Sequence, residues 1–289
     1  MKNITLNLNG RLISLEQPVV MGILNATPDS FYNQGLASSP YALLATAGKM
    51  VDEGAFMLDI GAISTRPGAE MITVEEEWQR LKKAIRIIRK AFPQTVLSVD
   101  TFRSEIARRA AAEGIDIIND ISAGDMDAGM LKTVADLNLP YIAMHMQGRP
   151  DTMQIEPRYD DVVREITDYF IQKTAVIEQA GIKDVIIDPG FGFGKTTVQN
   201  YQLLMALNEF RILDKPILAG LSRKSMIYKV LGNTAAEALN ATTALNMLAL
   251  QNGADILRVH DVKEAMECVR LWEYAKISAT EGLDTLKVK

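Results

Sequence analysis

Residues 56–99, FMLDIGAISTRPGAEMITVEEEWQRLKKAIRIIRKAFPQTVLSV, contain the pattern that decides the fold. Apolar runs stand at both ends of this stretch, at residues 56–60 and 96–99. Between them, apolar side chains recur every three or four residues and form one helical stripe of Val74, Trp78, Leu81, Ile85, Ile88 and Phe92. Thr73 and Glu76 have the spacing of a capping box in front of the stripe. The stretch therefore predicts a strand, a helix and a second strand.

The same alternation extends over most of the chain. Further short apolar runs lie at residues 19–24, 115–118, 141–144, 185–187, 216–219 and 256–259. None of the runs alternates with polar residues, as expected for parallel strands that are buried on both faces. Helical patterns stand between them. One covers residues 235–250 behind the capping pair Thr234 and Glu237, and another follows Asp261 and Glu264.

Eight strands that alternate with helices predict an α/β fold, a (β/α)8 TIM barrel. A doubly wound open sheet is the alternative, but it usually has fewer strands, and its glycine fingerprint does not follow the first run. In front of the barrel, residues 2–15 alternate around Asn9 and Gly10, which predicts a β-hairpin with a two-residue turn. No linker or low-complexity segment interrupts the 289 residues, so we expect one domain over residues 1–289.

The composition excludes several classes of protein. Hydrophobic residues make up 48% of the chain and charged residues 23%, which excludes a disordered or fibrous protein. The formal net charge is −5 and there is no block of basic residues, so we expect no nucleic-acid partner. The single cysteine, Cys268, rules out an intrachain disulfide and a cysteine-based metal cluster, and its apolar surroundings predict a core position.

The sequence also predicts the compartment. No apolar run approaches the ~18 residues of a membrane span, so we expect no membrane partner. The polar, alternating residues at the N-terminus are unlike a signal peptide. We therefore expect a protein of the reducing cytoplasm.

Polar side chains occur where the predicted strands end. They are Asn25, Asp59, Asp100, Asn119, Asp120, His145, Asp188, Ser222, Arg223, Lys224, Arg258 and His260. In a parallel barrel these positions share the rim on which active sites are built. A single aspartate after a strand is most often a helix cap or a loop hydrogen-bonder, but polar ends on all eight strands favour a functional rim.

The residue types on this rim indicate what it binds. The cations Arg66, Lys224 and Arg258, together with Asn25, can hold an anion such as a phosphate. The carboxylates and amides suit a flat heterocycle with several N–H donors. The rim therefore offers groups for an anion and for a heterocycle.

Two other features receive structural interpretations. Residues 190–196, GFGFGKT, resemble a phosphate-binding P-loop, but Pro189 stands where that motif requires glycine. We expect these glycines to allow a sharp turn or a close approach of the backbone to a ligand. We expect His145 to be a packed rim residue rather than a metal ligand, because the chain has only two histidines.

Eight motifs within residues 19–270 resemble, in order, those of dihydropteroate synthases. They are MGILNATPDSF (21–31), DIGAISTRPGA (59–69), SVDT (98–101), IND (118–120), MHMQG (144–148), DPGFGFGK (188–195), SRKS (222–225) and RVHD (258–261). The first two are highly specific in combination. The family consists of βα barrels of the folate pathway. The resemblance implies that 6-hydroxymethyl-7,8-dihydropterin diphosphate condenses with 4-aminobenzoate, giving 7,8-dihydropteroate and diphosphate.

The resemblance also implies roles for individual residues. Asp100, Asn119, Asp188 and Lys224 would bind the pterin. Asn25, Thr65, Arg66, Arg258 and His260 would bind the diphosphate, with Mg²⁺ near Asn25. Phe31, Pro67, Phe193 and Ser225 would form the aminobenzoate site, with a helix beginning near Ser225. Asp100, Arg66, Lys224 and Arg258 are the residues expected to act in catalysis.

The chain departs from the family pattern in two loops. Ala62 and Ile63 replace a frequent Gly-Glu pair. Tyr32, Asn33 and Gln34 replace Ser-Asp-Gly, so the first loop lacks a carboxylate. Residues 65–68 carry no insertion, and sulfonamides are therefore expected to compete at the aminobenzoate site. A homodimer is a further implication of the resemblance.

Two other functions compete with the synthase. A pterin-binding methyltransferase domain on the same barrel would share Asp100, Asn119 and Asp188, but it has no use for Thr65 and Arg66. A non-catalytic barrel that binds a pterin or a partner gains nothing from cations that clamp a diphosphate. Replacing Arg66 by alanine separates a synthase, which should lose turnover and keep pterin affinity, from a binding module, which should show no dependence on diphosphate.

Overall fold

A computed structural model describes residues 5–8, 10–26, 40–63, 71–149, 153 and 156–280. Its centre is a ring of parallel strands: β3 (Val19–Asn25), β4 (Met57–Gly61), β5 (Val96–Asp100), β6 (Ile117–Asp120), β7 (Tyr141–Met144), β8 (Val185–Asp188), β9 (Leu218–Ala219) and β10 (Ile256–Val259). The strands are ordered β8-β7-β6-β5-β4-β3-β10-β9. A parallel bridge between Ile187 and Ile217 brings the two edge strands together. The barrel prediction is confirmed, and the open sheet is excluded.

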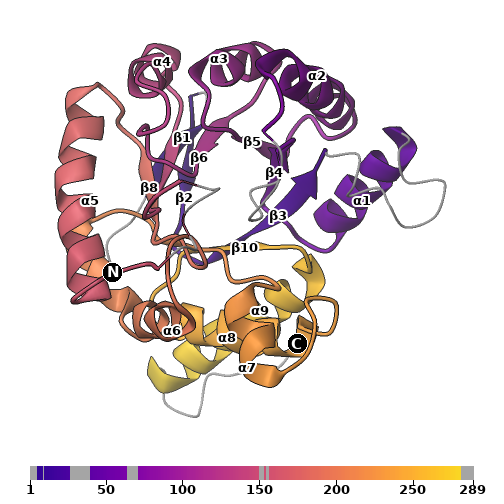
Figure 1. Cartoon of the computed structure of the whole chain (residues 1–289). Helices are drawn as coiled ribbons and strands as arrows, with labels where there is room; N and C mark the ends of the chain where they lie inside the picture. The colour runs from indigo at the N-terminus through magenta and orange to yellow at the C-terminus, as the bar shows by residue number, and fades with distance from the viewer. Residues whose placement is uncertain are drawn as a thin grey trace.

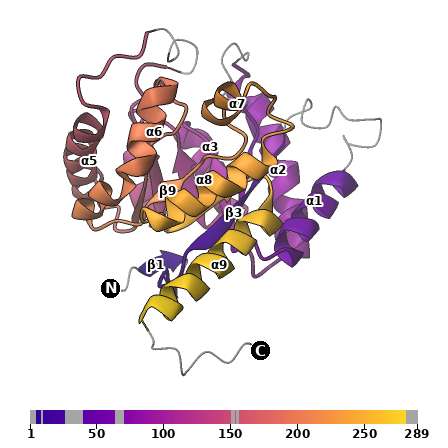
Figure 2. The same ribbon diagram turned by 90° about the horizontal axis from the view of Figure 1, so that it is seen from below.

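Helices surround the strands, as Figures 1 and 2 show. They are α1 (Pro40–Asp52), α2 (Val74–Ala91), α3 (Ser104–Ala112), α4 (Met130–Leu137), α5 (Val162–Gln179), α6 (Thr197–Met205), the 3-10 helix η2 (Leu207–Leu213), α7 (Ser225–Leu231), α8 (Leu239–Gln251) and α9 (Val262–Thr280). In the predicted stripe Trp78, Leu81, Ile85 and Ile88 are buried and Val74 and Phe92 are partly buried. The Thr73 hydroxyl accepts from the Glu76 amide at 3.2 Å. Within the described residues, no helix is long and apolar enough to cross a membrane.

The predicted start of the helix at residues 235–250 is wrong, because α8 begins four residues later, at Leu239. Glu237 does accept from the Thr234 amide at 3.0 Å, but no helix follows this pair directly. The guanidinium of Arg223 donates to the carbonyls of Ala235 and Ala236, at 3.1 and 2.8 Å. The Ala235 carbonyl also accepts from the Ala238 amide at 3.4 Å, a bond between residues three apart, so the segment is a turn that precedes α8.

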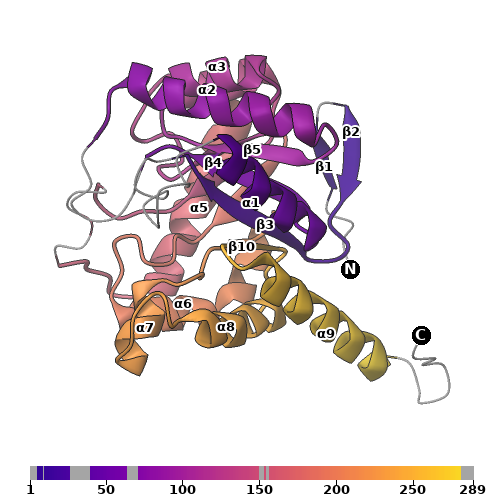
Figure 3. The ribbon, with the colours of Figure 1, turned by 90° about the vertical axis from the view of Figure 1, so that its right-hand side faces the viewer.

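The N-terminal hairpin is confirmed as the antiparallel strands β1 (Thr5–Leu8) and β2 (Arg11–Ser14). Gly10 has a φ of +85°, and its amide donates to the side chain of Asn7 at 2.9 Å. The hairpin lies across one end of the barrel (Figure 3). Leu6, Leu8 and the following Leu15 pack there against one apolar residue from each of the eight strands: Met21, Met57, Val96, Ile117, Ile142, Ile186, Leu218 and Ile256.

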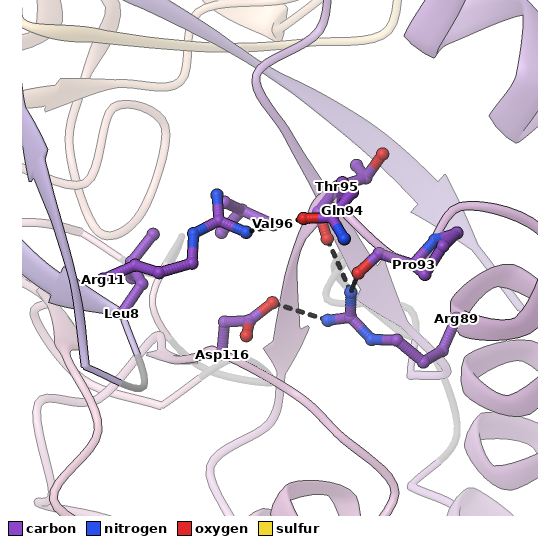
Figure 4. A pocket seen from close by; sticks show the side chains of 8 residues that line it. All are labelled: Leu8, Arg11, Arg89, Pro93, Gln94, Thr95, Val96 and Asp116. Atoms are coloured by element: carbon purple, nitrogen blue, oxygen red, sulfur yellow. Dashed lines mark hydrogen bonds and ion pairs between the residues drawn. The ribbon is translucent and has the colours of Figure 1, made fainter.

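A small pocket lies at this same end of the barrel, between the hairpin and the amino end of β5 (Figure 4). Arg89 fills one wall, and all five of its N–H donors are used by the carbonyls of Pro93, Thr95 and Gly114 and by the carboxylate of Asp116. A guanidinium with no donor left cannot hold a ligand anion. Arg89 therefore has a structural role here, and the strand-end residues of the predicted site lie at the opposite rim.

Candidate active site

The strand register brings the predicted site residues together at one rim. Asn25 lies beside Gly61, Gly61 lies beside Asp100, and Asp100 lies beside Asn119 on consecutive strands. On the other side of the ring, Met144 at the end of β7 lies beside Asp188 at the end of β8. The carboxyl ends of the strands therefore form one polar surface, as the barrel architecture requires.

Arg258 links two carboxylates across the barrel mouth. Its Nε donates to Asp59 Oδ2 and its Nη2 donates to Asp100 Oδ2, both at 2.7 Å. The same Asp59 oxygen accepts from the Asn119 side-chain amide at 2.9 Å. Asp59 is completely buried, so it fixes both the guanidinium and the amide from below.

The charged groups of this cluster shift one another's pKa values. Burial raises the pKa of Asp100 to about 7, the charge of Arg258 opposes this shift, and the carboxylates of Asp59, Asp120 and Glu77 reinforce it. Burial also disfavours the charged form of Arg258, but Asp59 and Asp100 outweigh it and raise the pKa of the guanidinium. Arg258 therefore stays charged, whereas Asp100 exchanges its proton close to neutral pH.

Asp188 and Lys224 form the second charged pair of the rim. Asp188 Oδ1 accepts from the Gly190 amide at 2.8 Å. The Lys224 ammonium donates to the Phe191 carbonyl and lies 4.7 Å from the centre of the Phe193 ring. Burial lowers the pKa of Lys224 to about 8, and the nearby Asp188 carboxylate opposes that shift. The pair thus presents an acceptor and a donor side by side next to an aromatic face.

His260 is oriented by Ser222. The Ser222 hydroxyl accepts from the backbone amide of His260 at 3.2 Å and lies 2.9 Å from its Nδ1. The two contacts of the Ser222 hydroxyl, one to the backbone and one to the ring, fix the orientation of the imidazole.

An apolar patch borders these polar groups. Phe102, Ile121 and Met144 form its buried part, and Ile63, Met126, Met146 and Phe193 pack against them. Ile63, one of the two departures in the second loop, thus contributes an apolar side chain to this patch. Ser225 begins α7, which confirms the helix predicted to begin near this residue.

The other sequence expectations have mixed outcomes. His145 is a packed, buried rim residue, 4.8 Å from the ring of Tyr169, and Cys268 is a buried free thiol, both as predicted. Phe31, Asn33, Thr65, Arg66 and Pro67 lie outside the described residues. Among the residues that are described, no three histidine, cysteine, aspartate or glutamate side chains gather as metal ligands.

Two residues were given no role from the sequence although the structure places them at the centre of the site. Asp59 appeared among the rim carboxylates and in the motif at residues 59–69, and Lys195 appeared in a rejected P-loop and in the motif at residues 188–195, without a role of its own for either residue. The signal for Asp59 was its position two residues before the end of β4 in an otherwise apolar strand. The signal for Lys195 was a charged residue at the end of a glycine-rich turn. Neither signal shows which residue will be the hydrogen-bond partner.

Comparison with known proteins identifies the family. A family model described as pterin binding enzyme matches residues 21–260. The dihydropteroate synthase of Escherichia coli strain K12 is 45% identical over 275 residues, which cover 94% of this chain and 96% of that protein. The structure resembles that of Xanthomonas albilineans dihydropteroate synthase with 4-aminobenzoic acid, with a TM-score of 0.89 and 41% identity over 95% of this chain and 99% of that one.

A second solved structure agrees with the first. The Yersinia pestis dihydropteroate synthase, in complex with a sulfonamide drug, has a TM-score of 0.90 and 38% identity, and the match covers 95% of this chain and 100% of that one. Family model, sequence identity and fold therefore point the same way. The chain belongs to the dihydropteroate synthase family of pterin-binding enzymes.

Proposed function

We propose that this protein condenses 6-hydroxymethyl-7,8-dihydropterin diphosphate with 4-aminobenzoate and releases 7,8-dihydropteroate and diphosphate. The observation that carries the proposal is the arrangement of Arg258 between Asp59 and Asp100, with Asp188 and Lys224 on the same rim. This arrangement combines a group that can hold an anion with carboxylates that can accept from a heterocycle.

The pterin is assigned to Asp100, Asn119, Asp188 and Lys224. A pterin presents an amino group and a ring N–H side by side, and the free oxygen atoms of a carboxylate such as Asp188 can accept from both. The Lys224 ammonium is placed to donate to the pterin carbonyl. As the bond to the leaving group breaks, the pterin methylene gains positive charge, and the ionised form of Asp100 stabilises it.

The diphosphate is assigned to Asn25, Thr65, Arg66, Arg258 and His260. Charge builds on the leaving oxygen while its bond to the methylene carbon breaks, and fixed cations and N–H donors lower the energy of that state. Arg258 is held in place by Asp59 and Asp100 before any substrate arrives. The guanidinium therefore needs little reorganisation during the reaction.

Mg²⁺ is proposed to bind together with the diphosphate. Asn25 lies exposed at the end of β3 and offers one amide oxygen. Mg²⁺ characteristically keeps several waters and binds through substrate phosphates plus one or two protein oxygens, so a single amide fits this mode of binding. When bound, the ion neutralises part of the charge on the departing diphosphate.

The aminobenzoate is assigned to Phe31, Pro67, Phe193 and Ser225. The Phe193 ring lies beside the charged pair, and Ser225 offers a helix start near which a carboxylate is favoured. The aniline nitrogen forms a bond to the methylene carbon as the carbon–oxygen bond breaks and the electron pair leaves with diphosphate. The nitrogen then loses a proton to solvent, and no side chain is required as a general base.

Release of diphosphate tests the proposal directly. Purified protein is incubated with dihydropterin diphosphate and Mg²⁺, with and without 4-aminobenzoate. We expect release that depends on aminobenzoate and is matched by an equal amount of dihydropteroate. A protein that binds the pterin but releases nothing would instead support the methyltransferase or binding-module alternatives. The Arg66→Ala variant separates binding from turnover in the same assay.

Sulfonamides should compete with 4-aminobenzoate, since a sulfonamide places a similar aniline ring and anionic group in the same subsite. We expect the apparent KM for aminobenzoate to rise in proportion to the drug, with kcat unchanged. Steady-state kinetics at several drug concentrations measures this. Full activity at saturating drug and limiting aminobenzoate would contradict the assigned subsite.

Three sequence predictions outside the reaction remain proposals. We propose that residues 1–289 form one domain, that the protein works in the cytoplasm, and that it forms a homodimer. The buried free thiol of Cys268 is compatible with a reducing compartment.

A further inference from the structure

The turn that follows β8 is built from backbone packed on backbone. Gly190, Gly192 and Gly194 all have positive φ. A Cβ at Gly190 would lie 1.9 Å from the His145 carbonyl oxygen, and a Cβ at Gly194 would lie 2.4 Å from the Gln147 carbonyl oxygen. Only glycine fits at such distances. The glycine-rich turn therefore packs closely against the backbone that follows β7.

The side chain of Lys195 is enclosed by this turn. It is 3% exposed, and its ammonium donates to the carbonyls of Gly190 and Phe193, both at 2.9 Å. It also lies 3.1 Å from His145 Nδ1. Burial and the charge of Lys195 lower the pKa of His145 to about 2, so its ring is neutral and Nδ1 can accept. The His145 carbonyl lies farther from the ammonium, at 3.4 Å, and the three nearer acceptors match its three N–H groups.

Asn200 supports the same turn from α6. Its side-chain oxygen accepts from the Gly192 amide at 2.6 Å, and its side-chain nitrogen donates to the carbonyls of Lys195 and Thr196 at 3.3 and 2.7 Å. The Phe193 amide donates back to the Gly190 carbonyl at 3.1 Å. Phe193 is therefore fixed through its carbonyl by Lys195 and through its neighbour by Asn200.

Lys195 and Asp188, the residue from which the turn starts, both bind Gly190: Asp188 Oδ1 accepts from its amide at 2.8 Å, and the Lys195 ammonium donates to its carbonyl at 2.9 Å. Burial raises the pKa of Asp188, and the Lys224 charge opposes that shift most strongly, followed by the Gly190 amide, the Arg258 charge and the Lys195 charge. Burial lowers the pKa of Lys195 in turn, and the Asp188 carboxylate opposes this effect. Removing the Lys195 charge should therefore make Asp188 easier to protonate.

We propose that Lys195 is a positioning residue: a buried ammonium that fixes the carbonyls of the 190–194 turn, holds Phe193 for the aminobenzoate ring and favours the ionised form of Asp188 for the pterin. This inference rests on the proposed function and adds two roles to it. The first role is one of geometry and acts through Phe193. The second role is electrostatic and acts through Asp188.

Two variants separate these roles. Lys195→Met keeps the length of the side chain but removes both charge and donors, whereas Lys195→Gln removes the charge and keeps two N–H donors. Affinity for the pterin substrate is measured by calorimetry from pH 5 to 9, and the KM for 4-aminobenzoate is measured by steady-state kinetics. This pH range is about twice as wide as the range over which a single ionisable group titrates.

In both variants we expect pterin affinity to be lost at a higher pH than in the parent protein, because Asp188 takes up its proton earlier. We expect the KM for aminobenzoate to rise about tenfold in Lys195→Met, because three acceptors lose their donor, and to rise less in Lys195→Gln. Lys173→Met is the matched control. It removes another largely enclosed ammonium, paired with Asp125, outside the turn.

An unchanged pH dependence of pterin affinity in a folded Lys195→Gln protein would overturn the electrostatic role. An unchanged KM for aminobenzoate in Lys195→Met would overturn the positioning role. If neither variant folds, ¹⁵N NMR of the Lys195 side chain in the parent protein decides, since a neutral amine at pH 7 contradicts the proposal. A parent protein that releases no diphosphate would instead refute the proposed function itself.

Discussion

The carboxylate of Asp59 accepts from Arg258 and from Asn119 through one oxygen atom, Oδ2. Both donors belong to the proposed substrate site, whereas Asp59 itself is completely buried. Its effect on the reaction is therefore indirect: it sets where the guanidinium and the amide stand. A buried carboxylate that keeps a cation in place is costly to remove, because the partner is left with an unbalanced charge.

Replacing Asp59 by asparagine should test this role. We expect unfolding free energy to fall by about 3 kcal/mol and kcat/KM for the pterin substrate to fall at least about tenfold, because Arg258 loses one of its two anchors. Urea denaturation and steady-state kinetics measure the two effects. Asp136→Asn is the control, since Asp136 pairs with Lys132 on the exposed face of α4 and should change stability by about 0–1 kcal/mol. If the two variants had equal stability and equal kcat/KM, Asp59 would have no role in the site.

Protonation of Asp100 should cause the loss of activity on the acid side of the pH profile. Its pKa is raised to about 7, and only the ionised form stabilises a cationic pterin. We therefore expect kcat/KM for the pterin substrate to fall as pH drops below about 7. Because Asp59 contributes to the raised pKa, Asp59→Asn should move this loss of activity to lower pH, whereas loss of the Arg258 charge would move it higher. A profile that stays flat from pH 5 to 8 would contradict the assignment.

Residue roles were the least predictable feature of the sequence. The positions of Asp100, Asn119, Asp188 and Arg258 followed from strand ends and motifs. The role of Asp59 did not, because its partners lie 60 and 199 residues away along the chain. A local pattern shows that a polar residue ends a strand, but it does not show which donor the fold brings to it.

At the scale of elements, the turn between β8 and α6 depends on glycine for a steric reason. Gly190→Ala should lower unfolding free energy by several kcal/mol, since the new Cβ would overlap the His145 carbonyl oxygen. Gly232→Ala is the control, because Gly232 also has a positive φ but has open space around it. There we expect only the backbone cost of about 1 kcal/mol. Thermal melts compare the variants, and equal losses would mean that the turn relaxes freely.

Elements were predictable where apolar runs alone define them. All eight strands were found because a barrel strand is buried on both faces and leaves a mostly apolar run without regular polar alternation. The start of α8 was predicted too early because the capping pair Thr234 and Glu237 is a local signal. Arg223, which holds the carbonyls behind that pair, in turn forms an ion pair with Asp261 from the start of α9. The deciding interaction is therefore tertiary.

At the scale of the whole molecule, the two ends of the barrel have different tasks. One end is closed by apolar side chains from the hairpin and from all eight strands. The other end carries the charged groups of the proposed site, which are partly or fully buried, and this burial shifts the pKa values of Asp100 and Lys224 toward their neutral forms. The apolar end must then supply stability that the charged rim does not. This division predicts that the ends respond separately to substitution.

Leu6→Ala should show the separation. Leu6 is 1% exposed in the hairpin, so its truncation leaves a cavity and should lower unfolding free energy by about 3 kcal/mol. Leu12→Ala in the same hairpin is the control, since Leu12 is 72% exposed and should change stability by less than about 0.5 kcal/mol. Both variants should keep the parent KM for both substrates at 25 °C. A folded Leu6→Ala protein with an altered KM would mean that the hairpin reaches the rim through the strands, and that stability and chemistry share one network.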